Sequence, residues 1–155
     1  MRRALLLTAL LLPAACSDAA PAAPSSPLPT AEVVLAGASG QSSLNVEVAD
    51  TEAERAQGLM GRTSLPPDAG MAFLWDEPVT STFWMKDTEI PLAIAFWAQG
   101  GTIVSIREMT PCAADPCATY AADAPFVGAV EANAGYFDDH DIGVGDRATV
   151  LRNDG

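Results

Sequence analysis

Short apolar segments that alternate with turn residues constrain the fold of this chain more than any other feature of its sequence. Segments of this length between Gly, Pro and Asp residues are typical of β-strands. Gln99, Gly100 and Gly101 lie between the apolar segments 90–97 and 102–109. They predict a hairpin, because glycine readily adopts the positive φ values of tight turns. The four segments are residues 71–75 (MAFLW), 81–85 (STFWM), 90–97 (IPLAIAFW) and 102–109 (TIVSIREM).

The rest of the chain adds strands and at most two short helices. We expect strands at residues 32–36, 44–48, 126–132 and 143–151. Thr51 and Glu54 have the spacing of a capping box, which predicts a helix that ends near Gly61, and a second short helix is expected at 133–139. The sequence therefore predicts a mainly β, compact single domain of barrel or sandwich type. Its expected core is rich in aromatic residues: Phe73, Trp75, Phe83, Trp84, Phe96, Trp97 and Phe126.

The first thirty residues have the pattern of an export signal followed by a tether. Residues 1–15 combine a basic start, a short apolar run and small residues before Cys16. This pattern is similar to that of bacterial lipoproteins, in which the Cys is lipidated and becomes the new N-terminus. Ordinary secretion, with Cys16 incidental, is the alternative. The four prolines in residues 16–30 predict a semi-extended tether, and residues 31–155 then form the globular domain.

The charge of the chain excludes some functions and favours others. The 155 residues include 8 Lys or Arg and 20 Asp or Glu, for a formal net charge of −12. This acidity argues against nucleic-acid binding, which requires a basic surface. We expect a monomer that is anchored to a bacterial membrane by its N-terminal lipid and faces the periplasm or the cell surface. Its expected partner is a small molecule or an envelope protein.

Cys112 and Cys117 lie five positions apart in a Pro-containing segment. In an exported domain this arrangement favours a disulfide. Redox exchange and zinc binding are weaker alternatives, because the spacing is not C-x-x-C and one distant His leaves a zinc site short of ligands. We expect no cofactor and no metal.

The acidic segment 138–141 (DDHD) is the densest cluster of ionisable residues and includes the only His of the chain, His140. Its spacing differs from that of a calcium-binding loop. A solvated helix end is the favoured interpretation, and cation binding stays open.

The segment 83–88 (FWMKDT) contains the only Lys of the chain. On a strand, Trp84 and Lys86 share one face. The simpler interpretation places Trp84 in the core and pairs Lys86 with Asp87 in the turn. The functional alternative is a ligand pocket with an aromatic floor and polar groups at its rim. Its candidate residues, which include two from one face of a later strand, are Trp84, Lys86, Asp87, Thr88, Glu131 and Asn133.

Four segments together resemble one protein family: residues 52–78, 81–97, 110–120 and 130–146. Their order and spacing are similar to those of the bacterial and archaeal family called domain of unknown function 192, or uncharacterised protein family 0127. The resemblance implies a compact β-rich fold and frequent export behind a signal or lipoprotein leader, and no established activity. Two positions depart from the family pattern: Asp87 stands where Asn is frequent, and Tyr136 where Trp is usual.

These observations favour a non-enzymatic, membrane-tethered domain that binds a small ligand or an envelope partner. A hydrolase-like enzyme that uses Lys86, Asp87 and Glu131 is one alternative, although the sequence shows no nucleophile–base pair and no catalytic residue is assigned. A purely structural component of the envelope is the other alternative.

Overall fold

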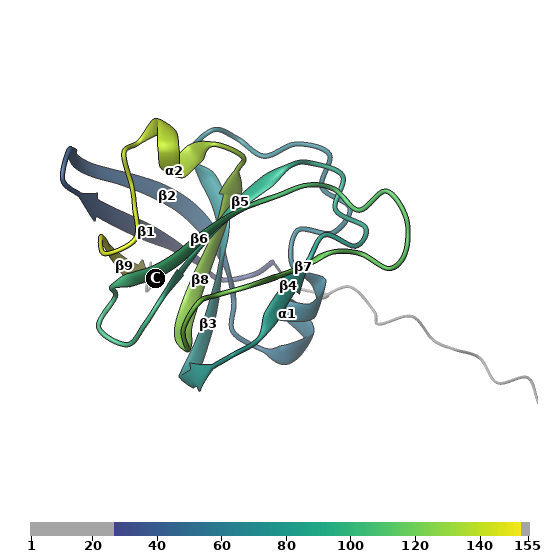
Figure 1. The fold of residues 1–155 in the computed structure, drawn as a ribbon, viewed down its shortest axis with the longest axis horizontal. Coiled ribbons are helices and arrows are strands. Elements are labelled where there is room, and N and C mark those ends of the chain that lie inside the picture. Colours follow the sequence, from purple (N-terminus) through teal and green to yellow (C-terminus); the bar gives the residue numbers. More distant parts are fainter. Residues whose placement is uncertain (1–26, 153–155) are drawn as a thin grey trace, which may run out of the picture.

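A seven-stranded sheet that curls into a half-barrel forms most of the molecule, and a two-stranded sheet lies beside it (Figure 1). The structure is a computed structural model and describes residues 27–152. The strand order is β6-β5-β8-β3-β2-β1-β9 in the large sheet and β4-β7 in the small one. The expected fold class, mainly β with one or two short helices, is confirmed, and the structure has two. In chain order the elements are β1 (Thr30–Gly37), β2 (Gly40–Ala49), α1 (Glu52–Gln57), β3 (Ala69–Val79), β4 (Thr82–Trp84), β5 (Leu92–Trp97), β6 (Ile103–Met109), β7 (Thr119–Ala121), β8 (Phe126–Asn133), α2 (Tyr136–Asp139) and β9 (Arg147–Arg152).

The two outer strands of the large sheet, β6 and β9, meet at one end. The backbone N–H of Ile103 donates to the carbonyl of Asp146 at 2.8 Å, and that of Ala148 donates to the carbonyl of Gly101 at 2.8 Å. A side chain at Gly101 would place its Cβ 2.4 Å from the Ala148 carbonyl oxygen. The second glycine of the predicted hairpin therefore permits both the turn and the contact that curls the sheet.

Strand β5 is buried on both faces, which explains why its sequence is continuously apolar. Ala93, Ala95 and Trp97 enter a core that includes residues of β1, β2, β9 and α2. Leu92, Ile94 and Phe96 enter a second core on the other face of β3, β5 and β8. Leu59 and Met85, from the segments after α1 and β4, cover this second core. The candidate site lies on the same side of the sheet.

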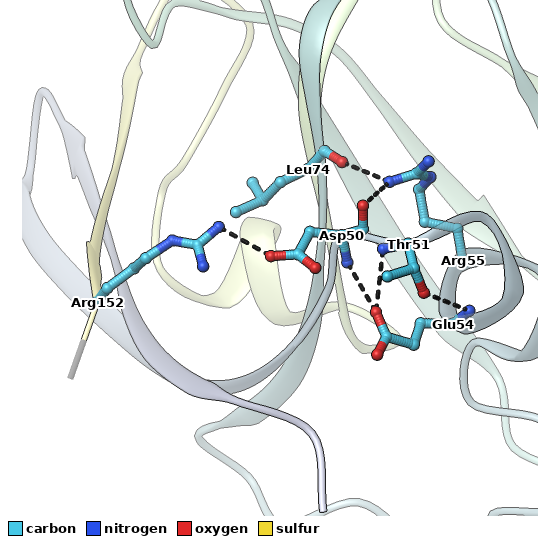
Figure 2. Close-up of polar contacts among 6 residues, drawn as sticks. All are labelled: Asp50, Thr51, Glu54, Arg55, Leu74 and Arg152. Atoms are coloured by element: carbon cyan, nitrogen blue, oxygen red, sulfur yellow. Dashed lines mark hydrogen bonds and ion pairs between the residues drawn. The ribbon is translucent and has the colours of Figure 1, made fainter. Parts of the chain in front are cut away.

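Helix α1 connects the parallel strands β2 and β3, and its position depends on polar contacts at its first turn (Figure 2). The predicted capping box is present: the Glu54 backbone N–H donates to the Thr51 hydroxyl at 3.3 Å, and the Thr51 N–H donates to the Glu54 carboxylate at 3.0 Å. Arg55 donates to the carbonyls of Asp50 and Leu74 at 2.6 and 2.8 Å, and so ties the helix to β3. The helix ends at Gln57 rather than near Gly61, because Gly58 already turns the chain with a φ of 48°.

The sequence patterns missed one strand and misplaced one boundary of each helix. Strand β7 has only three residues and forms by pairing with β4, so it shows no periodicity of its own. Strand β8 continues to Asn133 and pairs there with Leu92, which delays α2 until Tyr136. None of the helices within residues 27–152 is long and apolar enough to cross a membrane. The predicted signal and Cys16 lie outside the described residues.

Candidate functional site

A cavity of about 400 Å³ opens between α1, the segment 58–60, β4 and the second core, a volume typical of small-molecule sites. Its floor reaches β3 and β8, and its mouth includes the exposed side chains of Glu52, Ala56 and Trp84. The lining residues are Glu52, Arg55, Ala56, Gln57, Gly58, Leu59, Met60, Phe73, Trp75, Ser81, Thr82, Phe83, Trp84, Thr88 and Glu131.

Glu131 is the unusual member of this lining. Its backbone pairs with Met71 of β3 on one side and Ile94 of β5 on the other, so only its side chain can reach the cavity. The residue is 4% exposed, and no side chain or backbone group within residues 27–152 donates a hydrogen bond to its carboxyl group. Burial raises the pKa of this carboxyl from 4.5 to about 8. At pH 7 the cavity therefore contains a mostly neutral carboxyl group that can both donate and accept hydrogen bonds.

Aromatic rings form the walls beside Glu131. Phe83 packs edge-to-face against Phe73, with ring centroids 5.0 Å apart, and against Trp75 at 6.3 Å. The Arg55 guanidinium lies over the Trp75 ring, 4.9 Å from its centroid. Because Arg55 also donates to two backbone carbonyls, its position is constrained by both the segment before α1 and strand β3 (Figure 2).

The structure places three of the six candidate pocket residues in this cavity: Trp84, Thr88 and Glu131. The other three lie outside the lining. Lys86 points its Nζ toward the Asp115 carboxylate at 3.6 Å, and Asn133 donates to the carbonyls of Leu65 and Pro66 at 3.2 and 3.0 Å.

Asp87 acts through its backbone. Its φ of 52° lies in the left-handed region, which Asp and Asn enter more readily than most residues. Its carbonyl accepts a hydrogen bond from the Gly61 N–H at 2.8 Å. Asp87 therefore joins the turn after β4 to the segment after α1, and both segments line the cavity.

The simpler interpretation of residues 83–88 places Trp84 in the core and pairs Lys86 with Asp87, and it is wrong on both points. Trp84 is 50% exposed, and Met85 is buried in its place at 1%. Strand β4 pairs only with β7, at the side of the molecule, so one of its faces stays open to solvent. Lys86 pairs with Asp115 of the cysteine loop instead of Asp87, and its Nζ lies 5.8 Å from the Trp84 ring centroid.

The sequence patterns identified Glu131 as a candidate but missed most of the walls. Phe73 and Phe83 were expected only in the core, and Arg55 was not singled out. Strand alternation shows that Met71, Phe73 and Trp75 share a face, but it does not show that α1 crosses that face. A single carboxylic acid in the otherwise apolar strand FVGAVEA was the one local signal of the cavity.

The predicted disulfide is confirmed, since the sulfurs of Cys112 and Cys117 lie at bonding distance, 2.09 Å. With Asp115 these cysteines form the one described group of three potential metal ligands, but the sulfurs are bonded to each other. In the acidic segment 138–141, His140 lies with its Nδ1 2.7 Å from the Tyr136 carbonyl oxygen and its ring stacked on Tyr136. These contacts hold His140 against Tyr136, the first residue of α2.

Comparison with known proteins assigns the family. The family DUF192, described as Uncharacterized ACR, matches residues 34–150. The chain belongs to this family. No curated protein matches the chain.

Two solved structures are similar to this DUF192 chain. One is a Sinorhizobium meliloti protein described as a candidate transcription regulator, with 34% identity and a TM-score of 0.75, covering 81% of this chain and 97% of its own. The other is a protein of unknown function from Novosphingobium aromaticivorans, with 36% identity and a TM-score of 0.75, covering 85% of this chain and 94% of its own.

Three of the four segments that resemble the DUF192 family contribute to the cavity. Residues 52–78 supply α1 and its C-terminal turn, residues 81–97 supply β4 and Thr88, and residues 130–146 supply Glu131. The cavity is thus the place where segments far apart in the family pattern come together.

Proposed function

We propose that this protein is an exported, membrane-tethered module that binds a small molecule in the cavity in front of Glu131. The observation that carries the proposal is a buried carboxyl group without a hydrogen-bond partner among the described residues, at the floor of an aromatic cavity. A ligand that donates a hydrogen bond to this carboxyl would add a directional contact at the floor of the cavity. Buried acids with a strongly shifted pKa are concentrated at functional sites.

The contents of the cavity favour binding over hydrolysis. Lys86 lies outside the lining, where it pairs with Asp115, and His140 also lies outside it, in contact with Tyr136 of α2. Among the residues that line the cavity there is neither an amine nor an imidazole to activate the hydroxyl groups of Ser81, Thr82 or Thr88. The three residues of the hydrolase hypothesis, Lys86, Asp87 and Glu131, do not meet in one cavity.

The description of one structural neighbour as a candidate transcription regulator concerns that protein. For this chain we propose no nucleic-acid function, because a formal net charge of −12 repels phosphate groups.

A matched pair of variants on α1 tests ligand binding in the cavity. Ala56 and Ala53 are both exposed on α1, and only Ala56 lines the cavity. A set of small fragments with cationic, neutral and anionic head groups is screened by ligand-observed NMR. The screen is run against the parent protein and against the Ala56→Phe and Ala53→Phe variants. We expect the bound fragments to lose at least about tenfold in affinity in Ala56→Phe, whose ring fills the mouth, and less than twofold in Ala53→Phe. Fragments that bind all three proteins equally, or no bound fragment, would contradict the proposal.

The membrane tether is tested by replacing the proposed lipidated residue. In cells that express the full chain, Cys16→Ser is expected to move the protein from the membrane fraction to the soluble fraction, because the lipid chains provide the attachment. The double variant Cys112→Ser/Cys117→Ser is the control, and it should stay in the membrane fraction. A Cys16→Ser protein that remains membrane-bound would show that the tether is not the lipid.

A further inference from the structure

The one cationic side chain that lines the cavity, Arg55, forms no ion pair with the buried acid Glu131. The charged residues that line the cavity are Glu52, Arg55 and Glu131. Arg55 donates to the carbonyls of Asp50 and Leu74 and lies over the Trp75 ring, and burial alone accounts for the raised pKa of Glu131. Within residues 27–152 the Glu131 carboxylate therefore has no ion-pair partner, although its side chain reaches the cavity.

The walls and the overall charge both suit a cation. Aromatic ring faces attract ammonium groups by about 0.5–2 kcal/mol, and Phe73, Trp75, Phe83 and Trp84 all line this cavity. The net charge of −12 also raises the local concentration of cations near the protein.

We propose that the cavity binds a small protonated amine, whose ammonium group donates hydrogen bonds to the Glu131 carboxylate while its hydrocarbon part contacts Phe73 and Phe83. This proposal rests on the function proposed above and adds the chemical class of the ligand. When Glu131 is protonated in the free protein, binding releases that proton to solvent, and the ammonium cation replaces it as the partner of the carboxylate.

Other ligand classes fit the cavity less well. An anion would face Glu52 and Glu131 and would gain only Arg55, which is already held by two carbonyls. A purely apolar ligand would leave Glu131 buried without a partner. A neutral alcohol can bond to the protonated acid but gains neither the ion pair nor the attraction to the ring faces.

The test uses three probes that share a phenyl group and differ in charge: 2-phenylethylammonium, 2-phenylethanol and 3-phenylpropanoate. Their affinities for the parent protein, Glu131→Gln and Glu89→Gln are measured by calorimetry at pH 8. Glu89 is exposed and outside the cavity lining, so its variant controls for the loss of one negative charge. We expect the parent and Glu89→Gln to bind the ammonium probe at least about tenfold more tightly than the alcohol, and Glu131→Gln to lose this preference while it still binds the alcohol.

A second measurement does not depend on any variant. In the parent, the affinity for 2-phenylethylammonium should rise about tenfold per pH unit below pH 8, because Glu131 must lose its proton while the amine stays charged. The other ionisable groups that face the cavity are Glu52 and Arg55, both from α1. The affinity for 2-phenylethanol should not rise over the same range.

The outcomes separate the two proposals. Equal affinity for the ammonium probe and the alcohol, or an ammonium affinity that is unchanged in Glu131→Gln or unchanged with pH, would overturn the amine proposal and leave the small-molecule site intact. If none of the three probes binds, the amine proposal is overturned, and the fragment screen with Ala56→Phe then decides the small-molecule site separately.

Discussion

Glu131→Gln is expected to stabilise the folded protein by about 4 kcal/mol at pH 8 and to leave its stability nearly unchanged at pH 4. The folded state raises the pKa of this carboxyl from 4.5 to about 8, and each factor of ten in a protonation constant corresponds to about 1.4 kcal/mol. Below pH 4.5 the acid is protonated in both states, so the two proteins differ little. As the pH rises from 4.5 to 8, the unfolded parent releases a proton that the folded parent retains, and the parent loses stability.

Urea denaturation of the parent and of Glu131→Gln at several pH values measures this difference. The free energy of unfolding of the variant minus that of the parent should grow steadily between pH 4.5 and 8. Glu89→Gln, which removes an exposed acid, serves as the control and should show a small difference that changes little with pH. A difference between Glu131→Gln and the parent that does not change with pH would mean that Glu131 is ionised in the folded protein.

Gly70→Ala is expected to destabilise the fold by about 3 kcal/mol, because strand β3 approaches the central strand β8 too closely at this position for any side chain. A Cβ at Gly70 would lie 2.3 Å from the backbone carbonyl oxygen of Glu131. Neither strand can relax easily, since Met71 pairs with Glu131 and Val46 pairs with Gly70. The substitution would therefore also displace the acid at the floor of the cavity.

Gly143→Ala is the matched control for Gly70→Ala, because a Cβ at Gly143 meets only the Asp146 carboxylate, at an ordinary 3.9 Å. Chemical denaturation should show a change of less than about 1 kcal/mol for this variant. Equal stability of Gly70→Ala and Gly143→Ala would show that the two strands separate readily near Glu131.

The fold class and several local structures could be predicted because their causes are local in sequence. The capping box at Thr51 and Glu54 and the hairpin at Gly100 and Gly101 form from groups a few positions apart. The continuous apolar run of β5 likewise reflects burial on both faces of one strand. Strand β7 could not be predicted in this way, since its three residues become a strand only by pairing with β4.

The candidate site could be predicted only where its signal is local in sequence. Glu131 stands out as an acid in an apolar strand, whereas Lys86 and Asn133 were grouped with it only through strand alternation. Alternation gives the face of the sheet on which a side chain lies, but not what covers that face. The structure places Lys86 beside Asp115 and uses Asn133 to bind the carbonyls of Leu65 and Pro66.

The sequence by itself determined a mainly β domain, the start of its first helix and the position of one acid within an apolar strand. Only the tertiary structure decided that this acid lies at the floor of an aromatic cavity. The reason is physical: the periodicity of a strand depends on its own backbone, whereas burial of Glu131 depends on α1 and β4, which begin 79 and 49 positions earlier in the chain. Arg55 holds α1 over this face of the sheet through the Leu74 carbonyl, a contact across 19 positions that no local pattern encodes.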